Sequence, residues 1–216
     1  MPTEHDAEEE DVRASLALHP RSISEEQMRR YEGWIAEIFT AFGLDLHTPG
    51  TEATPHRFLL ALFHSTAGYE GDPKLLRTFP RECKGGPDCE VSQLVEGPIP
   101  YYALCEHHAL PFHGRAYIGY IAHERILGLS KFTRLVRIFS ERFTVQERLG
   151  QQIADTVDVV LKPHGVAVYL DGEHLCSQMR GIRETSSFTR TTFWRGHYAE
   201  NASLRTEFLE HVAARR

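Results

Sequence analysis

Four consecutive residues, Cys105-Glu106-His107-His108, carry the clearest metal-binding chemistry in this sequence. Cys105 and His108 are three residues apart, a spacing at which a thiolate and an imidazole can both reach one tetrahedral zinc ion. A third ligand must come from elsewhere in the chain, and Cys176 is the natural candidate because another histidine lies close to it. Two cysteines and one histidine would leave the fourth zinc position for water, which is the open arrangement of a catalytic site.

Two further histidines, His107 and His174, lie beside these candidate ligands. A neutral imidazole whose pKa is near the working pH is the usual general acid or base, so both rings could move protons. His174 is also explained as a residue that supports a ligand through a hydrogen bond. Each motif taken alone is equally well explained by buried cysteines and surface histidines.

The elements that must position these residues follow from the spacing of apolar and turn-forming residues. Helices that lead into a mixture of strands and helices indicate an α+β fold with an antiparallel sheet. We divide the chain into a tail over 1–23, a helical segment over 24–70 and a catalytic domain over 71–216. In chain order we expect helices over 24–43 and 54–68, a loop over 71–90, a strand over 115–121, helices from Ser130 and over 145–161, strands over 166–170 and 186–193, and a helix over 202–213.

Composition limits the classes of protein to which this chain can belong. It has 216 residues, of which 41% are hydrophobic and 25% charged, as in ordinary globular proteins. Residues 1–12 hold six acids and no Lys or Arg, which predicts a disordered acidic tail. Subtracting these six from the 30 acids leaves 24, equal to the 24 Lys and Arg, so the remainder is neutral and we expect no nucleic-acid partner.

The chain shows neither a secretory signal nor an apolar run long enough to span a bilayer. We therefore expect a cytoplasmic protein without membrane contact, whose thiols are reduced. Cys83 and Cys89 form a Cys-x5-Cys pair in the expected loop, which is more simply a surface loop with two thiols than a second metal site.

Several separated blocks of this sequence resemble the GTP cyclohydrolase I family, in order and spacing, from about residue 24 to 212. Any one block could arise by chance, whereas all of them in order are highly specific. The blocks are Ala53-Thr54-Pro55-His56-Arg57, Cys105-Glu106-His107-His108, Gly128-Leu129-Ser130-Lys131-Phe132-Thr133-Arg134, Val145-Gln146-Glu147-Arg148-Leu149, Gly165-Val166-Ala167-Val168, Glu173-His174-Leu175-Cys176 and Met179-Arg180-Gly181-Ile182-Arg183.

The resemblance implies the tunnelling fold, in which an antiparallel sheet is backed by two helices and the chains assemble into rings. Two pentameric rings stack into a homodecamer, with active sites at the subunit interfaces. It implies zinc held by Cys105, His108 and Cys176, and a water that the zinc activates to attack C8 of GTP. His107 would protonate N7, while His174 and Ser130 would handle protons as formate leaves and the product, 7,8-dihydroneopterin triphosphate, forms.

The resemblance also implies the residues that bind the substrate. Glu147 would accept hydrogen bonds from guanine, which adenine cannot supply, with assistance from Gln146. Lys131, Arg134 and Arg180 would bind the triphosphate, and Arg57 would reach in from a neighbouring subunit. Without the motif, Lys131 and Arg134 would be better explained as a solvated helix face.

The sequence departs from the family pattern at several places, among them the stretch over 81–100 that holds Cys83 and Cys89. The segment over 193–198 is bulky and basic for an edge strand, Ser177-Gln178 is more polar than usual, and Gly97-Pro98-Ile99-Pro100 should weaken a strand before the zinc motif. Two other hypotheses remain: a tunnelling-fold enzyme that acts on another pterin or purine, and a non-catalytic ring that binds purine nucleotides. The pathway that uses the product also remains open.

Overall fold

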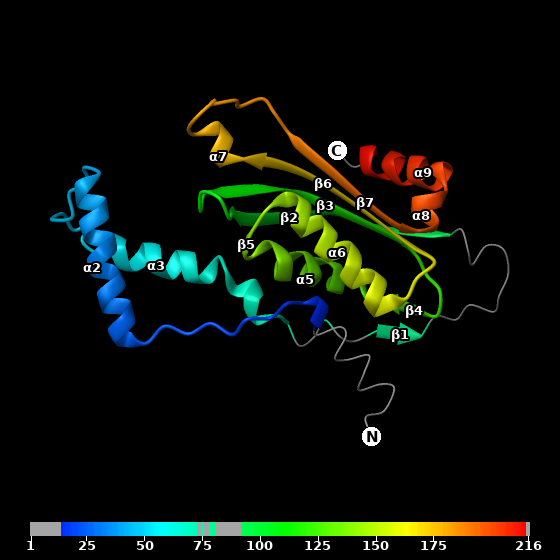
Figure 1. Cartoon of the computed structure of the whole chain (residues 1–216), viewed down its shortest axis with the longest axis horizontal. Helices are drawn as coiled ribbons and strands as arrows, with labels where there is room; N and C mark the ends of the chain where they lie inside the picture. The colour runs from blue at the N-terminus through cyan, green and yellow to red at the C-terminus, as the bar shows by residue number, and fades with distance from the viewer. Residues whose placement is uncertain (1–13, 73–74, 76–77, 81–91, 215–216) are drawn as a thin grey trace, which may run out of the picture.

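The computed structural model describes residues 14–72, 75, 78–80 and 92–214 (Figure 1). Most of the expected acidic tail, together with Cys83 and Cys89, lies outside these described residues. A five-stranded sheet with helices on both faces forms the body, which confirms the predicted α+β class.

The sheet has the strand order β5-β2-β3-β6-β7. Four long strands pair antiparallel, as predicted: β2 (Gln93–Cys105), β3 (Pro111–Ile121), β6 (Gly165–His174) and β7 (Thr189–Gly196). One edge departs from the predicted antiparallel pattern, because the two-residue strand β5 (Phe143–Thr144) pairs parallel with the end of β2. A strand this short carries no period-2 pattern from which it could be predicted.

The strand β2 runs through the prolines that were expected to weaken it. Its pairing with β3 shifts register between Glu96 and Ile99, and the bond between Gly97 and Pro98 is cis. The residues of β2 before and after this irregularity pair regularly with β3, so the strand still reaches the Cys-Glu-His-His motif.

Two helices, α5 (Leu129–Ser140) and α6 (Gln146–Leu161), cover one face of the sheet (Figure 1). The helix α6 follows its predicted position, whereas α5 begins at Leu129 with Gly128 as its N-cap, one residue before the predicted start at Ser130. In α5 the apolar residues Phe132, Leu135, Val136 and Phe139 recur at helical spacing and are all buried against the sheet.

The other face is covered by α8 (His197–Glu200) and α9 (Ala202–Ala213), so helices lie on both sides of the sheet (Figure 1). A second core fills this side, where Tyr198 and Phe208 pack on Tyr117 and Tyr169 of the strands. The helix α9 matches the helix predicted over 202–213, although the sequence pattern did not predict which face it covers.

A short two-stranded sheet forms at the opposite end of the body from β5. It pairs β1 (Thr78–Pro80) antiparallel with β4 (Arg125–Leu127), which leads directly into α5.

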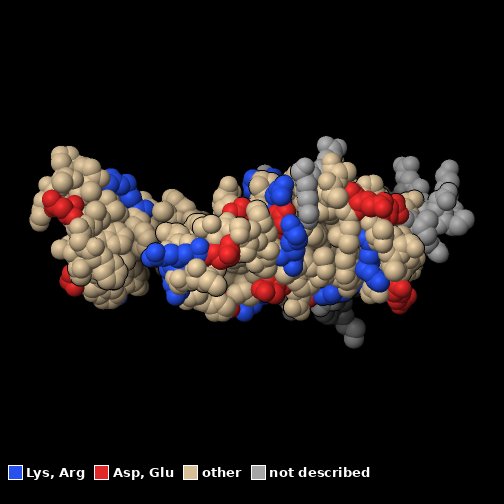
Figure 2. Space-filling model, turned by 90° about the horizontal axis from the view of Figure 1, so that it is seen from above, with Lys and Arg blue, Asp and Glu red and all other residues tan. Residues whose placement is uncertain are grey.

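The helical hairpin of α2 (Glu25–Ala41) and α3 (Thr54–His64) projects from the body, and the short helix η1 (Ala67–Glu70) connects it (Figures 1 and 2). Ser24 caps α2 as predicted, through a capping box with Gln27. The second helix was predicted to continue to about Gly68, but α3 ends at His64.

Every residue of α2, all of which the structure describes, is at least partly exposed. The hairpin nevertheless carries large apolar side chains, among them Trp34 and Phe42, which is 86% exposed. Among the helices of the described residues, none is both long and apolar enough to cross a membrane.

Candidate active site

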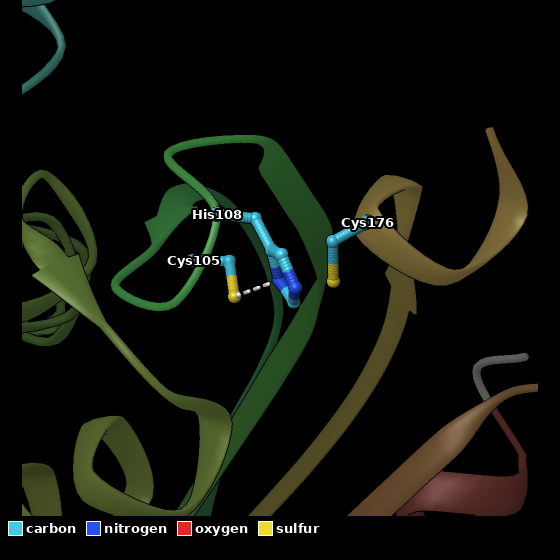
Figure 3. A group of neighbouring side chains, drawn as sticks. All are labelled: Cys105, His108 and Cys176. Carbon is cyan, nitrogen blue, oxygen red and sulfur yellow. Dashed lines mark hydrogen bonds between the residues drawn. The ribbon is translucent and has the colours of Figure 1, made fainter. Parts of the chain in front are cut away.

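The register of the sheet brings three metal-binding side chains together at one end of β3. Cys105 is the last residue of β2, His108 lies in the turn that leads into β3, and Cys176 lies in α7 (Leu175–Gln178), directly after β6. Because β3 pairs with both β2 and β6, the ends of these two strands lie on either side of its first residues. Figure 3 shows the two thiols and the imidazole converging from these elements.

The ligand atoms of Cys105, His108 and Cys176 all lie within 4.8 Å of one another, and Cys105 Sγ is 3.7 Å from His108 Nδ1. Tetrahedral zinc with bonds of about 2.0–2.3 Å places its ligand atoms about 3.5–3.8 Å apart. A small adjustment of the side chains would therefore accommodate the ion. Both cysteines are free thiols, so the donor set matches that expected from the sequence.

The electrostatics of the paired thiols also favour a cation. Burial raises the pKa of the Cys176 thiol, and the neighbouring Cys105 raises it further, while Arg180 acts in the opposite direction. Two thiolates this close repel each other in the absence of a positive charge. A bound metal ion would provide that charge and hold both sulfurs as thiolates.

The turn that carries His107 and His108 is held by its own backbone and by α6. Ala109 has a positive φ of 53°, and its N–H donates to Cys105 O over 2.8 Å. Glu106 accepts two hydrogen bonds from Arg148 of α6, one of them over 3.0 Å, and this contact lowers the pKa of Glu106. The ion pair ties the turn to the first turn of α6.

His107, the proposed acid for N7, lies in this turn beside the ligands. Its Nδ1 is 3.9 Å from Cys105 Sγ, and its ring centroid is 6.1 Å from that of His108. The ring is exposed, so it could meet a substrate that enters from solvent.

His174, the last residue of β6, lies next to the ligands on the other side of β3. Its ring stacks on Phe112, with centroids 4.7 Å apart and planes 2° apart, and its Nε2 is 3.0 Å from Gln146 Oε1. Burial lowers the pKa of His174, which favours the neutral ring, and the charge of Glu147 opposes this effect.

Gln146 and Glu147 begin α6 but face different environments. Gln146 is fully buried, and its amide hydrogen-bonds inside the protein. Glu147 is exposed in the single chain, and its charge acts to raise the pKa of His174. The Glu147 carboxylate is therefore accessible to a ligand, whereas the Gln146 amide is not.

The predicted phosphate ligands are divided between three places. Arg180 follows α7 and influences Cys176 electrostatically. Ser130, Lys131 and Arg134 lie in the first turns of α5, whereas it is the far end of α5 that approaches β5 and Cys105. The 12 residues of α5 span about 18 Å, so one chain does not bring these three residues to the metal ligands.

Arg134 and Arg57 both have partners within the chain. Arg134 forms an ion pair with Asp72, and with Ser130 it lines a hollow of about 520 Å³ between α5 and η1. Arg57 lies on the projecting hairpin and donates to Gly50 O over 2.6 Å and to Thr54 Oγ1 over 3.0 Å.

Sequence reasoning missed three contacts in this site: the ion pair of Glu106 with Arg148, the stacking of Phe112 on His174, and the hydrogen bond between Gln146 and His174. All three join residues distant in sequence, and no spacing rule connects them. Glu106, Arg148 and Gln146 do lie within the blocks already singled out, which is the one signal that could have drawn attention to them.

Comparison with known proteins gives consistent results over most of the chain. The family model described as GTP cyclohydrolase I matches residues 31–213. A GTP cyclohydrolase 1 of Deinococcus radiodurans is 40% identical over 176 residues, which cover 82% of this chain and 80% of that protein. The GTP cyclohydrolase 1 of Porphyromonas gingivalis is 36% identical (89% and 97% covered), and that of Saccharomyces cerevisiae is 36% identical (88% and 76% covered).

Among solved structures, an archaeosine synthase QueF-Like protein in its apo form aligns with 49% of this chain and 92% of that chain. The TM-score is 0.37 and the sequence identity 16%.

Proposed function

Because the chain belongs to the GTP cyclohydrolase I family, we propose that it hydrolyses GTP at guanine C8, releases formate and forms 7,8-dihydroneopterin triphosphate. The observation that carries this proposal is the convergence of Cys105, His108 and Cys176 beside His107 and His174. It combines an open metal site with two imidazoles able to move protons.

Cys105, His108 and Cys176 would hold zinc, for which two thiolates and one imidazole are suitable ligands. When bound, zinc would lower the pKa of water and so supply a nucleophile near neutral pH. The free thiols are the form that a reducing cytoplasm maintains, which is where we place the reaction.

The chain's own residues would handle the protons. His107 would donate to guanine N7 as the C8–N bond weakens, because its ring lies in the same turn as the ligand His108. His174 and Ser130 would serve the later steps, in which the ribose opens and recloses as part of the dihydropterin ring.

Glu147 would recognise guanine by accepting hydrogen bonds from N1–H and the 2-amino group. Adenine lacks this pair of donors, so a carboxylate enclosed by substrate would be left unpaired. Lys131, Arg134, Arg180 and Arg57 would bind the triphosphate, for which Arg134 must exchange Asp72 for phosphate.

We propose that the complete site forms between subunits of a ring in the tunnelling-fold arrangement, with two pentamers in a decamer. The distance between the start of α5 and the ligands supports this, because a second copy is needed to bring Ser130 and Lys131 to the metal. The exposed apolar residues of the α2–α3 hairpin also support assembly.

The test is to incubate the zinc-loaded protein with GTP and to quantify formate and oxidised neopterin together. Equal amounts of both would be the expected result. Formate without pterin would mean that rearrangement fails, which would contradict the roles of Ser130 and His174. The absence of both products, with zinc bound, would favour a nucleotide-binding ring or another substrate.

A further inference from the structure

The amide of Gln146 occupies a position that suits it to act on His174 rather than on substrate. It begins α6, is fully buried, and lies between β6, β7 and the imidazole of His174. The resemblance to the family suggested that Gln146 assists in binding guanine, but both ends of its amide are engaged within the protein.

The hydrogen-bond partners of Gln146 determine which end of its amide carries the nitrogen Nε2 and which carries the oxygen Oε1. Its Nε2 is 3.0 Å from Thr189 O and 3.4 Å from Leu170 O. Backbone carbonyls only accept hydrogen bonds, so the NH₂ group must face them. The oxygen Oε1 must then face the other way, toward His174.

Gly172 provides the space that this orientation needs. A Cβ at residue 172 would come within 2.4 Å of Gln146 Oε1 and 2.7 Å of the hydroxyl of Tyr101. That hydroxyl donates to Asp171 O over 2.9 Å, so it too is fixed. The amide therefore lies in a seat formed by β6 and β7, and cannot turn without losing its carbonyl partners.

From this geometry we infer that Gln146 is a positioning residue that keeps a hydrogen on Nε2 of His174 and so fixes the orientation of the ring. Oε1 can only accept, and it is 3.0 Å from Nε2, so Nε2 must be the donor. The stack on Phe112 fixes the plane of the ring. The nitrogen that can take up a proton is then Nδ1.

This inference rests on the proposed function and makes it more specific. Because Gln146 holds Nε2–H, the nitrogen left to exchange a proton with a substrate-derived intermediate is Nδ1. Oε1 continues to accept from Nε2 whether or not Nδ1 carries a proton.

Neutron crystallography of the zinc-loaded protein, exchanged into D₂O, tests the hydrogen on Nε2 without any need for turnover. We expect deuterium on Nε2 of His174, directed at Gln146 Oε1. A bare Nε2 would overturn the inference. If this experiment succeeds while wild-type protein releases no formate, the proposed function fails and the assignment of the hydrogen to Nε2 stands.

Kinetics of Gln146→Leu test the consequence for the reaction. We expect kcat to fall about 10- to 100-fold, as for other residues that orient a functional histidine, with little change in KM for GTP and in zinc content. A rise in KM at unchanged kcat would mean that Gln146 binds guanine and would contradict the inference.

Two further variants separate positioning from stability. Gly172→Ala would displace Oε1 from His174 while leaving the glutamine in place, so it should also lower kcat. Thr191→Val removes the hydroxyl 3.3 Å from Gln146 Nε2 without touching His174, and should leave the hydrogen on His174 Nε2 and kcat unchanged. If Thr191→Val lowered kcat as much as Gln146→Leu does, a general weakening of the seat would explain the effect and the inference would be wrong.

Discussion

Cys176 differs from the other two proposed ligands in its origin. Cys105 and His108 come from one strand end and the turn after it, whereas Cys176 comes from α7, beyond a different strand. Its thiol is needed to complete a three-ligand set, because two ligands alone bind zinc much more weakly.

We expect Cys176→Ala to lose zinc and formate release while the oligomer still assembles, because α7 contributes no buried residue to the described core. Metal analysis, formate assay and light scattering measure these three properties. Ser177→Ala, in the same short helix, is the matched control and should retain zinc. Stoichiometric zinc in Cys176→Ala would show that another residue serves as the third ligand.

Glu147 provides a second prediction for a single residue. A charged hydrogen bond is worth about 1.5–3 kcal/mol, so Glu147→Ala should weaken GTP binding by about 10- to 100-fold with zinc unchanged. Binding can be measured by calorimetry with GTP. Glu210→Ala, an equivalent change at an exposed position of α9, should have no effect. Unchanged affinity in Glu147→Ala would place guanine recognition elsewhere.

At the scale of elements, the bulky segment over 193–198 has a structural explanation. Phe193 faces α6, while Trp194 faces the opposite side of the sheet and packs edge-to-face on Phe208. Because successive side chains of a strand point to opposite faces of the sheet, these two bulky side chains pack in different cores. Gly150 of α6 allows the close approach, since a Cβ there would come within 2.2 Å of the Phe193 ring.

Gly150→Ala should therefore destabilise the protein by about 1–3 kcal/mol through overpacking, despite the gain of about 1 kcal/mol that alanine brings to a helix. Denaturant unfolding measures the change. Gly33→Ala in α2 is the control, because a Cβ there meets nothing within 4 Å and should stabilise slightly. Equal effects of the two substitutions would mean that α6 can move away from Phe193 without cost.

The helices of this region also show which structural features the sequence predicts and which it does not. The helices α5 and α6 were predicted correctly because their buried residues follow the helical period, although neither N-cap residue makes a side-chain capping hydrogen bond. The pairing of Glu106 with Arg148 and the inward direction of Gln146 were not predicted. Both depend on how α6 docks on the sheet, which is a long-range property that local spacing does not contain.

The candidate metal ligands followed from residue type and spacing within the Cys-Glu-His-His motif, and the structure brings Cys176 to that motif. The substrate-binding and catalytic roles came from the resemblance to the family and remain predictions. Their geometry cannot be read from one chain, because Ser130, Lys131 and Arg134 lie far from the ligands.

At the scale of the whole molecule, the α2–α3 hairpin is the largest part that lacks a core of its own. Its helices pack mainly on each other, through Phe39 and Phe58, and leave Trp34 and Phe42 exposed. In the proposed assembly, another copy would cover these exposed apolar side chains.

Phe42→Glu should weaken the proposed decamer and give smaller oligomers, because burying a carboxylate in an apolar contact is costly. Light scattering coupled to gel filtration measures the mass. Thr40→Glu adds the same charge at an exposed position nearby and should preserve the assembly. An unchanged mass for Phe42→Glu would mean that the hairpin does not form the contact between subunits.

The separation of the two halves of the site along α5 has a genetic consequence. An allele defective at Cys176 and an allele defective at Lys131 would each encode an inactive protein, yet each retains the half that the other lacks. In mixed rings, about a quarter of the sites would combine two intact halves, so two loss-of-function alleles would restore part of the activity to one cell. Co-expression followed by the formate assay would show this, and its failure would mean that one chain supplies both halves.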